Sequence, residues 1–230
     1  MGGKAVLGNG IISTRFWELD ALRGIGILLV VVYHLFFDLN YFGVLKIGLY
    51  EGPWLYFQRS IAVLMLLLVG AGLSLAYEKS FLRKENAFFK TIKRSAFLFA
   101  IAGLITFGTW VYPNKGFIVF GVIHFIALAV LLSYFFKNFF YENIVFGAVA
   151  IAAGFYLNTL STTSQWLLWL GVKFPGFYSL DYYPLFPWIG VVLVGMFLGK
   201  ALYTEYSRAF DLRIRRGKTA GALEYLGKNS

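Results

Sequence analysis

Six apolar stretches dominate this sequence, each close to the roughly 20 residues that a helix needs to cross the hydrocarbon core of a bilayer. They lie at 18–37, 55–77, 94–111, 117–136, 141–158 and 184–204. The chain has 230 residues, of which 59% are hydrophobic and 14% charged, too few polar residues to cover a water-soluble domain of this size. We therefore predict an all-α integral membrane protein, a single domain over residues 1–230 with about six transmembrane helices, located as a multi-pass protein in the cell membrane.

Two further segments, one apolar and one basic, are not expected to cross the membrane. The hydrophobic runs between 160 and 180 are too short to cross a bilayer, and their tryptophans, Trp166 and Trp169, favour an interfacial or re-entrant loop. The tail, 205–230, is basic and polar and is predicted to form a surface helix.

The distribution of Lys and Arg predicts the orientation, because short cytoplasmic loops carry an excess of these residues. The loop between the second and third spans and the C-terminal tail are rich in them, whereas the other loops hold only Lys46, Lys115 and Lys173. The basic residues of the two rich segments are Lys79, Arg83, Lys84, Lys90, Lys93 and Arg94, and Arg208, Arg213, Arg215, Arg216, Lys218 and Lys228. With six spans, both termini are predicted to be cytoplasmic.

Charge and composition exclude several function classes. The net charge is +10, but the basic residues flank apolar segments, which indicates membrane topology and contact with anionic lipid rather than nucleic acid. There are no cysteines, so disulfides, thiolate metal sites and cysteine nucleophiles are excluded. Two histidines without a nearby cluster of carboxylates predict no metal site.

The first apolar stretch contains four ionisable residues, Asp20, Arg23, His34 and Asp38. Ionisable residues inside a membrane cost roughly 2.5–3.5 kcal/mol each on insertion scales, so they are retained for a reason. At 100° per residue, Arg23 lies about 20° from His34 around the helix, and Asp20 and Asp38 lie within about 40° of it. The four residues therefore share one face of the predicted helix.

The spacing of this stripe suggests chemistry on a long substrate. Arg23 and His34 are separated by roughly 16 Å along the helix axis, about the reach of a pantetheine arm. A guanidinium suits a phosphate, an imidazole suits general-base or nucleophilic work on an acyl group, and Asp38 could fix the tautomer of His34. Two alternatives stay open at the other end of the stripe: Arg23 snorkelling to lipid phosphates, and Asp20 facing the helix dipole.

The motifs around this stripe resemble a known group of membrane enzymes. Asp20-Ala-Leu-Arg23-Gly followed by His34 is similar to the signature of the membrane acyltransferase-3 proteins. With His-Leu-Phe-Phe-Asp38, Gly121-Val-Ile-His124 and Asp181-Tyr-Tyr-Pro-Leu-Phe-Pro-Trp188, the chain more closely resembles the prokaryotic relatives of heparan-alpha-glucosaminide N-acetyltransferase. The resemblance implies transfer of an acetyl group from cytoplasmic acetyl-CoA to an acceptor, often a sugar, across the membrane.

Other residues are assigned around that reaction. We predict His34 and Asp38 to be catalytic, and Arg23, Asp20, Lys93 and Arg94 to bind the CoA portion. The predicted acceptor-binding residues are His124, Arg59, Asp181, Tyr182 and Trp188. For His124, a hydrogen bond to a neighbouring backbone explains the residue equally well, and Arg59 could be an interfacial anchor. The aromatic residues of 181–188 could equally form an interface belt.

The sequence thus favours a membrane acetyltransferase. A proton-coupled or lipid-linked transporter, with the stripe as a relay, is the alternative, although the chain has no internal repeat. A non-catalytic scaffold would gain nothing from the polar stripe. The sequence leaves open the acceptor, the length of the acyl group, whether His34 becomes acetylated, and whether the chain forms a homodimer.

Overall fold

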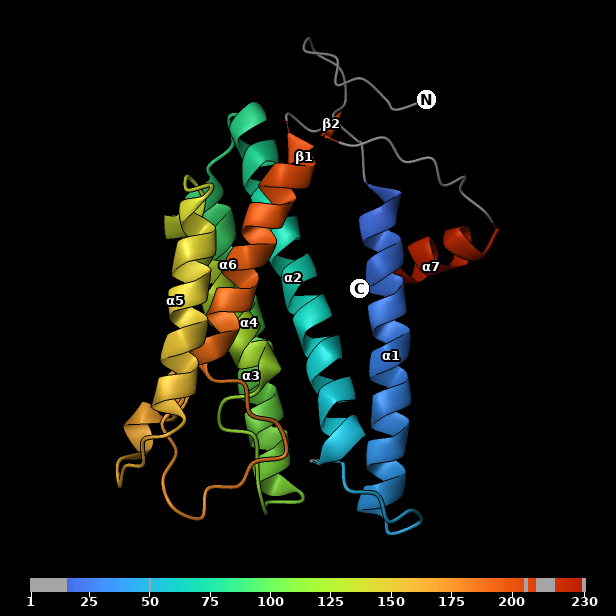
Figure 1. Ribbon diagram of the computed structural model, residues 1–230, viewed down its shortest axis with the longest axis vertical. Helices are drawn as coiled ribbons and strands as arrows, with labels where there is room; N and C mark the ends of the chain where they lie inside the picture. The colour runs from blue at the N-terminus through green and yellow to red at the C-terminus, as the bar shows by residue number, and fades with distance from the viewer. Residues whose placement is uncertain (1–15, 50, 205–206, 210–217, 229–230) are drawn as a thin grey trace. The chain divides into compact units, whose positions relative to one another are not determined.

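The computed structural model describes residues 16–49, 51–204, 207–209 and 218–228 (Figure 1). These residues form seven α-helices, one 3₁₀ helix and two short strands. The helices are α1 (Trp17–Tyr41), α2 (Gly52–Leu82), α3 (Ala87–Val111), α4 (Val122–Phe136), α5 (Glu142–Leu157), α6 (Leu185–Leu202) and α7 (Lys218–Lys228), with a 3₁₀ helix at Gln165–Leu170. Two strands, β1 (Tyr203–Thr204) and β2 (Ser207–Arg208), form an antiparallel pair.

Each predicted span corresponds to a helix, but the helices differ in length. Four of them, α1, α2, α3 and α6, are long and apolar enough to cross a membrane, whereas α4 and α5 have only 15 and 16 residues. A 15-residue helix is about 22 Å long, shorter than the roughly 30 Å hydrocarbon core. The prediction of six spans with both termini cytoplasmic stays a prediction.

The late start of α4 has a local cause. The helix was expected to begin near residue 117, but residues 117–121 are not helical and α4 begins at Val122. There it pairs with a later segment: Leu180 N donates to Gly116 O at 2.8 Å, and Tyr183 N donates to Phe120 O at 3.0 Å. Backbone groups engaged in these bonds are not available to extend the helix.

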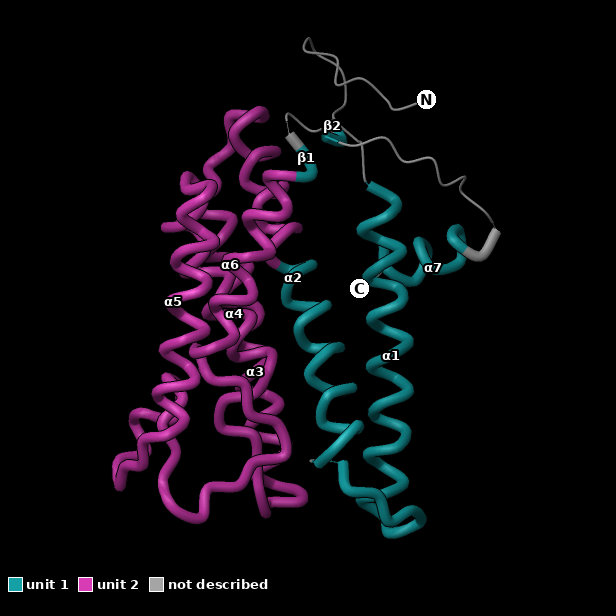
Figure 2. Tube along the Cα trace, in the orientation of Figure 1, with its two compact units in different colours: residues 1–69, 202–230 teal, residues 70–201 magenta. Residues whose placement is uncertain are grey.

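The chain divides into two compact units, residues 1–69 with 202–230, and residues 70–201, coloured separately in Figure 2. In the first unit, α1 packs against the first part of α2. Gly26 lies against the side chain of Met65, and the rings of Phe36 and Trp54 are 4.8 Å apart. These two contacts show that the helices run antiparallel.

Helix α7 also packs on α1, at the N-terminal end of α1 (Figure 1). Two glycines allow this approach. A Cβ at Gly24 would overlap the backbone of Leu223, and a Cβ at Gly227 would overlap the carbonyl group of Asp20. The two backbones are therefore in direct contact at both positions, and α7 covers the first turns of α1.

The second unit contains the rest of α2, with α3, α4, α5 and most of α6. Helices α5 and α6 approach closely at Gly147 and Gly190, where each glycine faces the backbone of the other. Polar side chains join α3 to α4: Ser95 Oγ, buried, donates to Ala127 O at 2.8 Å. Small residues and interhelical hydrogen bonds of this kind are the usual means of packing helices in a bilayer.

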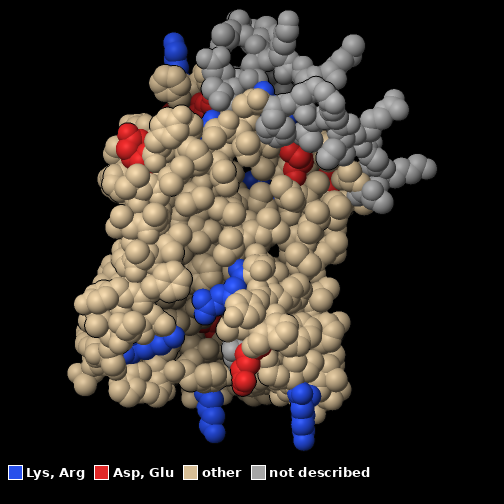
Figure 3. All heavy atoms as spheres, in the orientation of Figure 1, with Lys and Arg blue, Asp and Glu red and all other residues tan. Residues whose placement is uncertain are grey.

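The outer surface suits a lipid environment. On α3, Phe97, Leu104 and Phe107 are each more than 60% exposed. Most of the face drawn in Figure 3 is uncharged. Large apolar side chains in such number on a surface mark contact with a membrane or a partner rather than with water.

Candidate active site

Asp20 and Arg23, at the N-terminal end of the predicted stripe, form an ion pair. Arg23 NH1 lies 2.9 Å from Asp20 Oδ1, one turn away on α1. Asp20 is 2% exposed, whereas the Arg23 side chain is 29% exposed. A guanidinium has five N–H donors in a planar fork, so Arg23 has further donors in a geometry suited to phosphate. The buried carboxylate therefore acts to orient a partly exposed cation.

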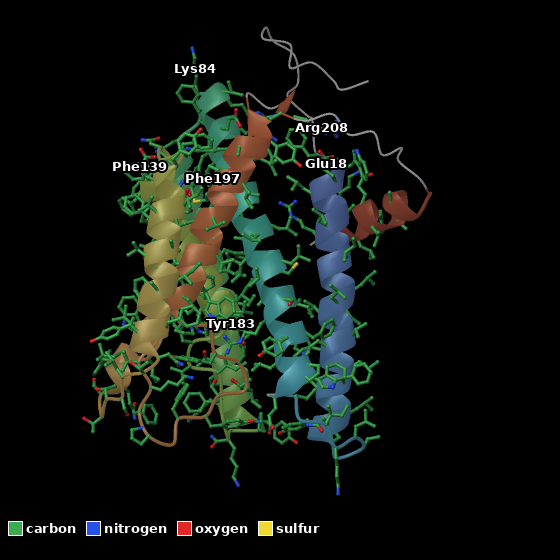
Figure 4. The ribbon with its side chains drawn as sticks, in the orientation of Figure 1. Glu18, Lys84, Phe139, Tyr183, Phe197 and Arg208 are labelled. Carbon is green, nitrogen blue, oxygen red and sulfur yellow. The ribbon has the colours of Figure 1, made fainter. Side chains whose placement is uncertain are left out.

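A second ion pair, which the sequence analysis did not predict, lies in the turn before it. Arg208 of β2 binds Glu18 with both ends of its fork, at 2.6 Å (Nε to Oε1) and 2.9 Å (NH2 to Oε2). Their side chains meet at the N-terminal end of α1 (Figure 4). Tyr203 of β1 donates to the same carboxylate at 3.3 Å, and its ring packs 4.2 Å from that of Phe16. The strand pair is thereby fixed to α1.

The ionisation of these groups favours the contact. The hydrogen bond to Glu18 raises the pKa of Arg208. Burial raises the pKa of Tyr203, and the neighbouring Glu18 carboxylate adds to this effect. The Tyr203 hydroxyl therefore remains protonated and able to donate to Glu18.

His34 and Asp38 lie one turn apart on α1, and both are exposed. The His34 ring is flanked by two aromatic neighbours on the same helix, with centroid distances of 6.0 Å to Tyr33 and 6.3 Å to Phe37. Phe37 is in turn 6.3 Å from Tyr41, so Tyr33, Phe37 and Tyr41 form an aromatic row at four-residue spacing beside the His34–Asp38 pair. An exposed imidazole and carboxylate beside this row have room for a reacting group.

Arg59 belongs to the same unit, on α2. It lies between the Gly26–Met65 and Phe36–Trp54 contacts, so its backbone is within about one helical turn of the level of His34. Its side chain is exposed. Among the predicted acceptor-binding residues, Arg59 is the one that the first unit brings to the level of His34.

His124 lies in the second unit, at the start of α4, and its ring is held by structural hydrogen bonds. Its Nδ1 accepts from Gly121 N at 3.3 Å, which assigns the proton to Nε2. Nε2 lies 3.1 Å from Thr106 Oγ1, which donates to Ile118 O at 2.7 Å. Both ring nitrogens are therefore engaged, as expected for a histidine that joins helices.

Asp181 caps the same helix from a distant part of the chain. Its Oδ2 accepts from Val122 N at 2.8 Å, which places a negative charge at the N-terminus of α4. The neighbouring Tyr182 donates to Leu168 O at 2.7 Å, and Trp188 is buried. These side chains hold the 158–184 segment in place, and their predicted role in acceptor binding stays a prediction.

The two remaining predicted CoA-binding residues, Lys93 and Arg94, lie on α3 in the second unit, and both are exposed. The helix begins nearby, with Asn86 Oδ1 accepting from Phe89 N at 3.0 Å. Lys93 and Arg94 thus belong to a different unit from Arg23. No group of three or more His, Cys, Asp and Glu side chains within the described residues could hold a metal ion.

Comparison with known families identifies the protein family to which this chain belongs. The family described as heparan-alpha-glucosaminide N-acetyltransferase, catalytic, matches residues 15–230, which contain α1 and every other described element. The chain belongs to the heparan-alpha-glucosaminide N-acetyltransferase family. A search of curated proteins and a search of solved structures found no match.

Membership of the heparan-alpha-glucosaminide N-acetyltransferase family confirms the resemblance seen in the sequence. It supports an N-acetyltransferase-like function, and the four long apolar helices agree with a membrane protein. The match begins next to α1, so the ionisable stripe lies within the matched region. The homodimer stays a prediction.

Sequence analysis of this member of the heparan-alpha-glucosaminide N-acetyltransferase family missed two groups of residues. Glu18 is visible in the sequence as an acidic residue in the first turn of an apolar helix, but nothing nearby in sequence identifies Arg208 as its partner. The aromatic row was visible as the four-residue spacing of Tyr33, Phe37 and Tyr41. Arg213, Arg215 and Arg216 of the predicted tail lie outside the described residues.

Proposed function

We propose that this protein transfers an acetyl group from cytoplasmic acetyl-CoA to an extracytoplasmic acceptor, a sugar amine or hydroxyl. The observation that carries the proposal is the family match over 15–230 together with the exposed His34–Asp38 pair on α1. The ion pair of Arg23 with Asp20 supports a donor-binding end on the same helix.

Arg23 binds a phosphate of the donor in this proposal. Its guanidinium is partly exposed, and the buried Asp20 carboxylate restricts its orientation. Charge-assisted, bidentate hydrogen bonds make arginine well suited to phosphate. The separation of roughly 16 Å from Arg23 to His34 along α1 lets an extended donor reach both residues.

His34 acts as the general base beside the acyl carbon. The acceptor amine or hydroxyl loses its proton to the imidazole, its nitrogen or oxygen bonds to the acyl carbon, and the thioester C–S bond breaks. The CoA thiolate leaves and takes up that proton from the imidazolium, which returns His34 to its neutral form. Asp38, one turn away, stabilises the imidazolium that forms. Arg59, near the level of His34, donates hydrogen bonds to oxygen atoms of the acceptor.

The decisive experiment measures label transfer from radioactive acetyl-CoA to glucosamine by purified protein in vesicles. Glucosamine is used because the family is named for a glucosaminide acceptor. We expect His34→Ala to lower kcat by about 10²- to 10⁴-fold, the usual contribution of a general base. Lys46→Gln, which removes one exposed charge outside the predicted site, is the matched control and should retain activity.

A second measurement separates donor binding from chemistry. Arg23→Gln should weaken acetyl-CoA binding in calorimetry, whereas His34→Ala should bind acetyl-CoA as the wild type does. Full transfer activity in His34→Ala would remove this residue from the reaction. Wild-type protein that bound no acetyl-CoA would contradict the acetyltransferase proposal and leave the transporter alternative.

A further inference from the structure

Helix α7 lies across α1 at a defined depth (Figure 1). Its contacts, Gly227 with Asp20 and Leu223 with Gly24, fall within the first two turns of α1. Helix α1 has 25 residues, so it is about 37 Å long and exceeds the roughly 30 Å hydrocarbon core. Its first turns, which begin with Trp17, therefore reach the membrane surface, as does α7.

The two long sides of α7 differ in chemistry. The side that faces α1 carries Glu224 and Gly227, both buried. The opposite side carries Ala222, Tyr225 and Leu226, at the i, i+3, i+4 spacing of one helix face. Tyr225 is 70% exposed and Leu226 is 40% exposed. The outward side of α7 therefore carries no acidic residue and exposes the side chains of Tyr225 and Leu226.

The charges in and around α7 favour an anionic surface. Arg208 is bound to Glu18, and residues 209–218 contain four further basic residues and one acidic residue, Asp211. Glu224, the one acidic residue of α7, is buried and lies 2.6 Å from Lys228. A short amphipathic helix beside a basic sequence is the pattern of an in-plane helix on anionic lipid.

We propose that the outward face of α7, formed by Ala222, Tyr225 and Leu226, inserts into an anionic lipid leaflet beside the first turns of α1. Lipid is the occupant that the charges favour, because a second copy on this face would bring two basic sequences together. Helix α7 then lies in the plane of the membrane surface.

The chain contains no cysteine, so one introduced cysteine can be labelled uniquely. We would attach the fluorophore NBD (nitrobenzoxadiazole) to Ala222→Cys, Tyr225→Cys and Leu226→Cys in the full chain, in phosphatidylcholine vesicles with and without phosphatidylglycerol. Ala222→Cys is the conservative variant if the larger residues are needed for folding. Lys84→Cys, in the exposed turn between α2 and α3, is the matched control.

We expect the α7 labels to emit at shorter wavelength than the Lys84→Cys label. Nitroxides on the upper acyl chain should quench them several-fold more strongly, with a larger effect in the anionic vesicles. Replacing Arg213, Arg215 and Arg216 together by Gln should remove the dependence on phosphatidylglycerol. Quenching of the α7 labels by aqueous iodide as strongly as the control would overturn the proposal. Protection from both iodide and lipid nitroxides would also overturn it, because protein would then cover the face.

Discussion

The guanidinium of Arg208 binds the carboxylate of Glu18 through two hydrogen bonds, Nε to Oε1 at 2.6 Å and NH2 to Oε2 at 2.9 Å, across 190 residues of sequence. Both side chains are largely shielded, at 26% and 12% exposure. Because this pair fixes β1 and β2 to the first turn of α1, its effect should be larger than that of an exposed salt bridge.

We expect Arg208→Gln to lower the free energy of unfolding by about 1–3 kcal/mol, since a shielded carboxylate loses its charged partner. Thermal unfolding in detergent measures this change, with Lys46→Gln as the control for the loss of one exposed positive charge. A double-mutant cycle with Glu18→Gln should give a coupling energy well above zero. Additive effects would show that the pair does not stabilise the fold.

The packing of α7 against α1 can be tested by substituting two glycines of α7, Gly221 and Gly227. A Cβ at Gly227 would overlap the Asp20 carbonyl, whereas a Cβ at Gly221 would have no atom within 4 Å. Gly227→Ala should therefore release α7, and its amides should exchange hydrogen faster. Gly221→Ala should leave exchange unchanged or slow it, since alanine favours the helix by about 1 kcal/mol. Equal exchange in the two variants would contradict the packing described.

Asp181 is expected to matter as a helix cap. Asp181→Ala removes the acceptor for Val122 N and the charge at the N-terminus of α4, which should cost about 1–2 kcal/mol of stability. Asp181→Asn keeps an acceptor oxygen and should recover part of that loss. Unfolding of the two variants at neutral pH measures the difference, and an Asn variant no better than Ala would assign the effect to the charge alone.

Because of Tyr182, the free energy of unfolding should depend on pH in the alkaline range. Burial raises the pKa of its hydroxyl to about 12, whereas a tyrosine in an unfolded chain has a pKa of about 10. The folded protein holds this proton more tightly, so Tyr182 favours folding below about pH 10 and loses that contribution as the pH rises toward 12.

Tyr182→Phe tests this dependence. The variant loses the hydrogen bond to Leu168 O and should be less stable by about 1 kcal/mol at neutral pH. Its stability should then fall less steeply than that of the wild type above about pH 10, the unfolded pKa of the residue it removes. Denaturant unfolding at several pH values measures both slopes, and parallel curves would show that the Tyr182 proton is not held by folding.

The helices were largely predictable, because backbone groups in lipid must bond within their own segment. The start of α4 was not, since residues 116–121 bond to a segment some sixty positions later. The spacing of Asp20, Arg23, His34 and Asp38 predicts one helix face, yet Asp20 is buried and His34 is exposed. Asp20 lies where α7 contacts α1 through Gly24 and Gly227, and this contact leaves no periodic signal in the sequence.

The contact of α7 with α1 also sets an order of events during synthesis. Asp20 and Gly227 are separated by roughly 200 residues of sequence. At about 5–20 residues per second, the ribosome therefore completes α7 some 10–40 s after α1 is made. During that interval the backbone of α1 at Asp20 and Gly24 lacks the contact that α7 makes with it. Helix α1, although made long before α7, is thus completed only when α7 packs against it, and a ribosome stalled before α7 holds a chain in which the backbone of α1 at Asp20 and Gly24 has no such contact.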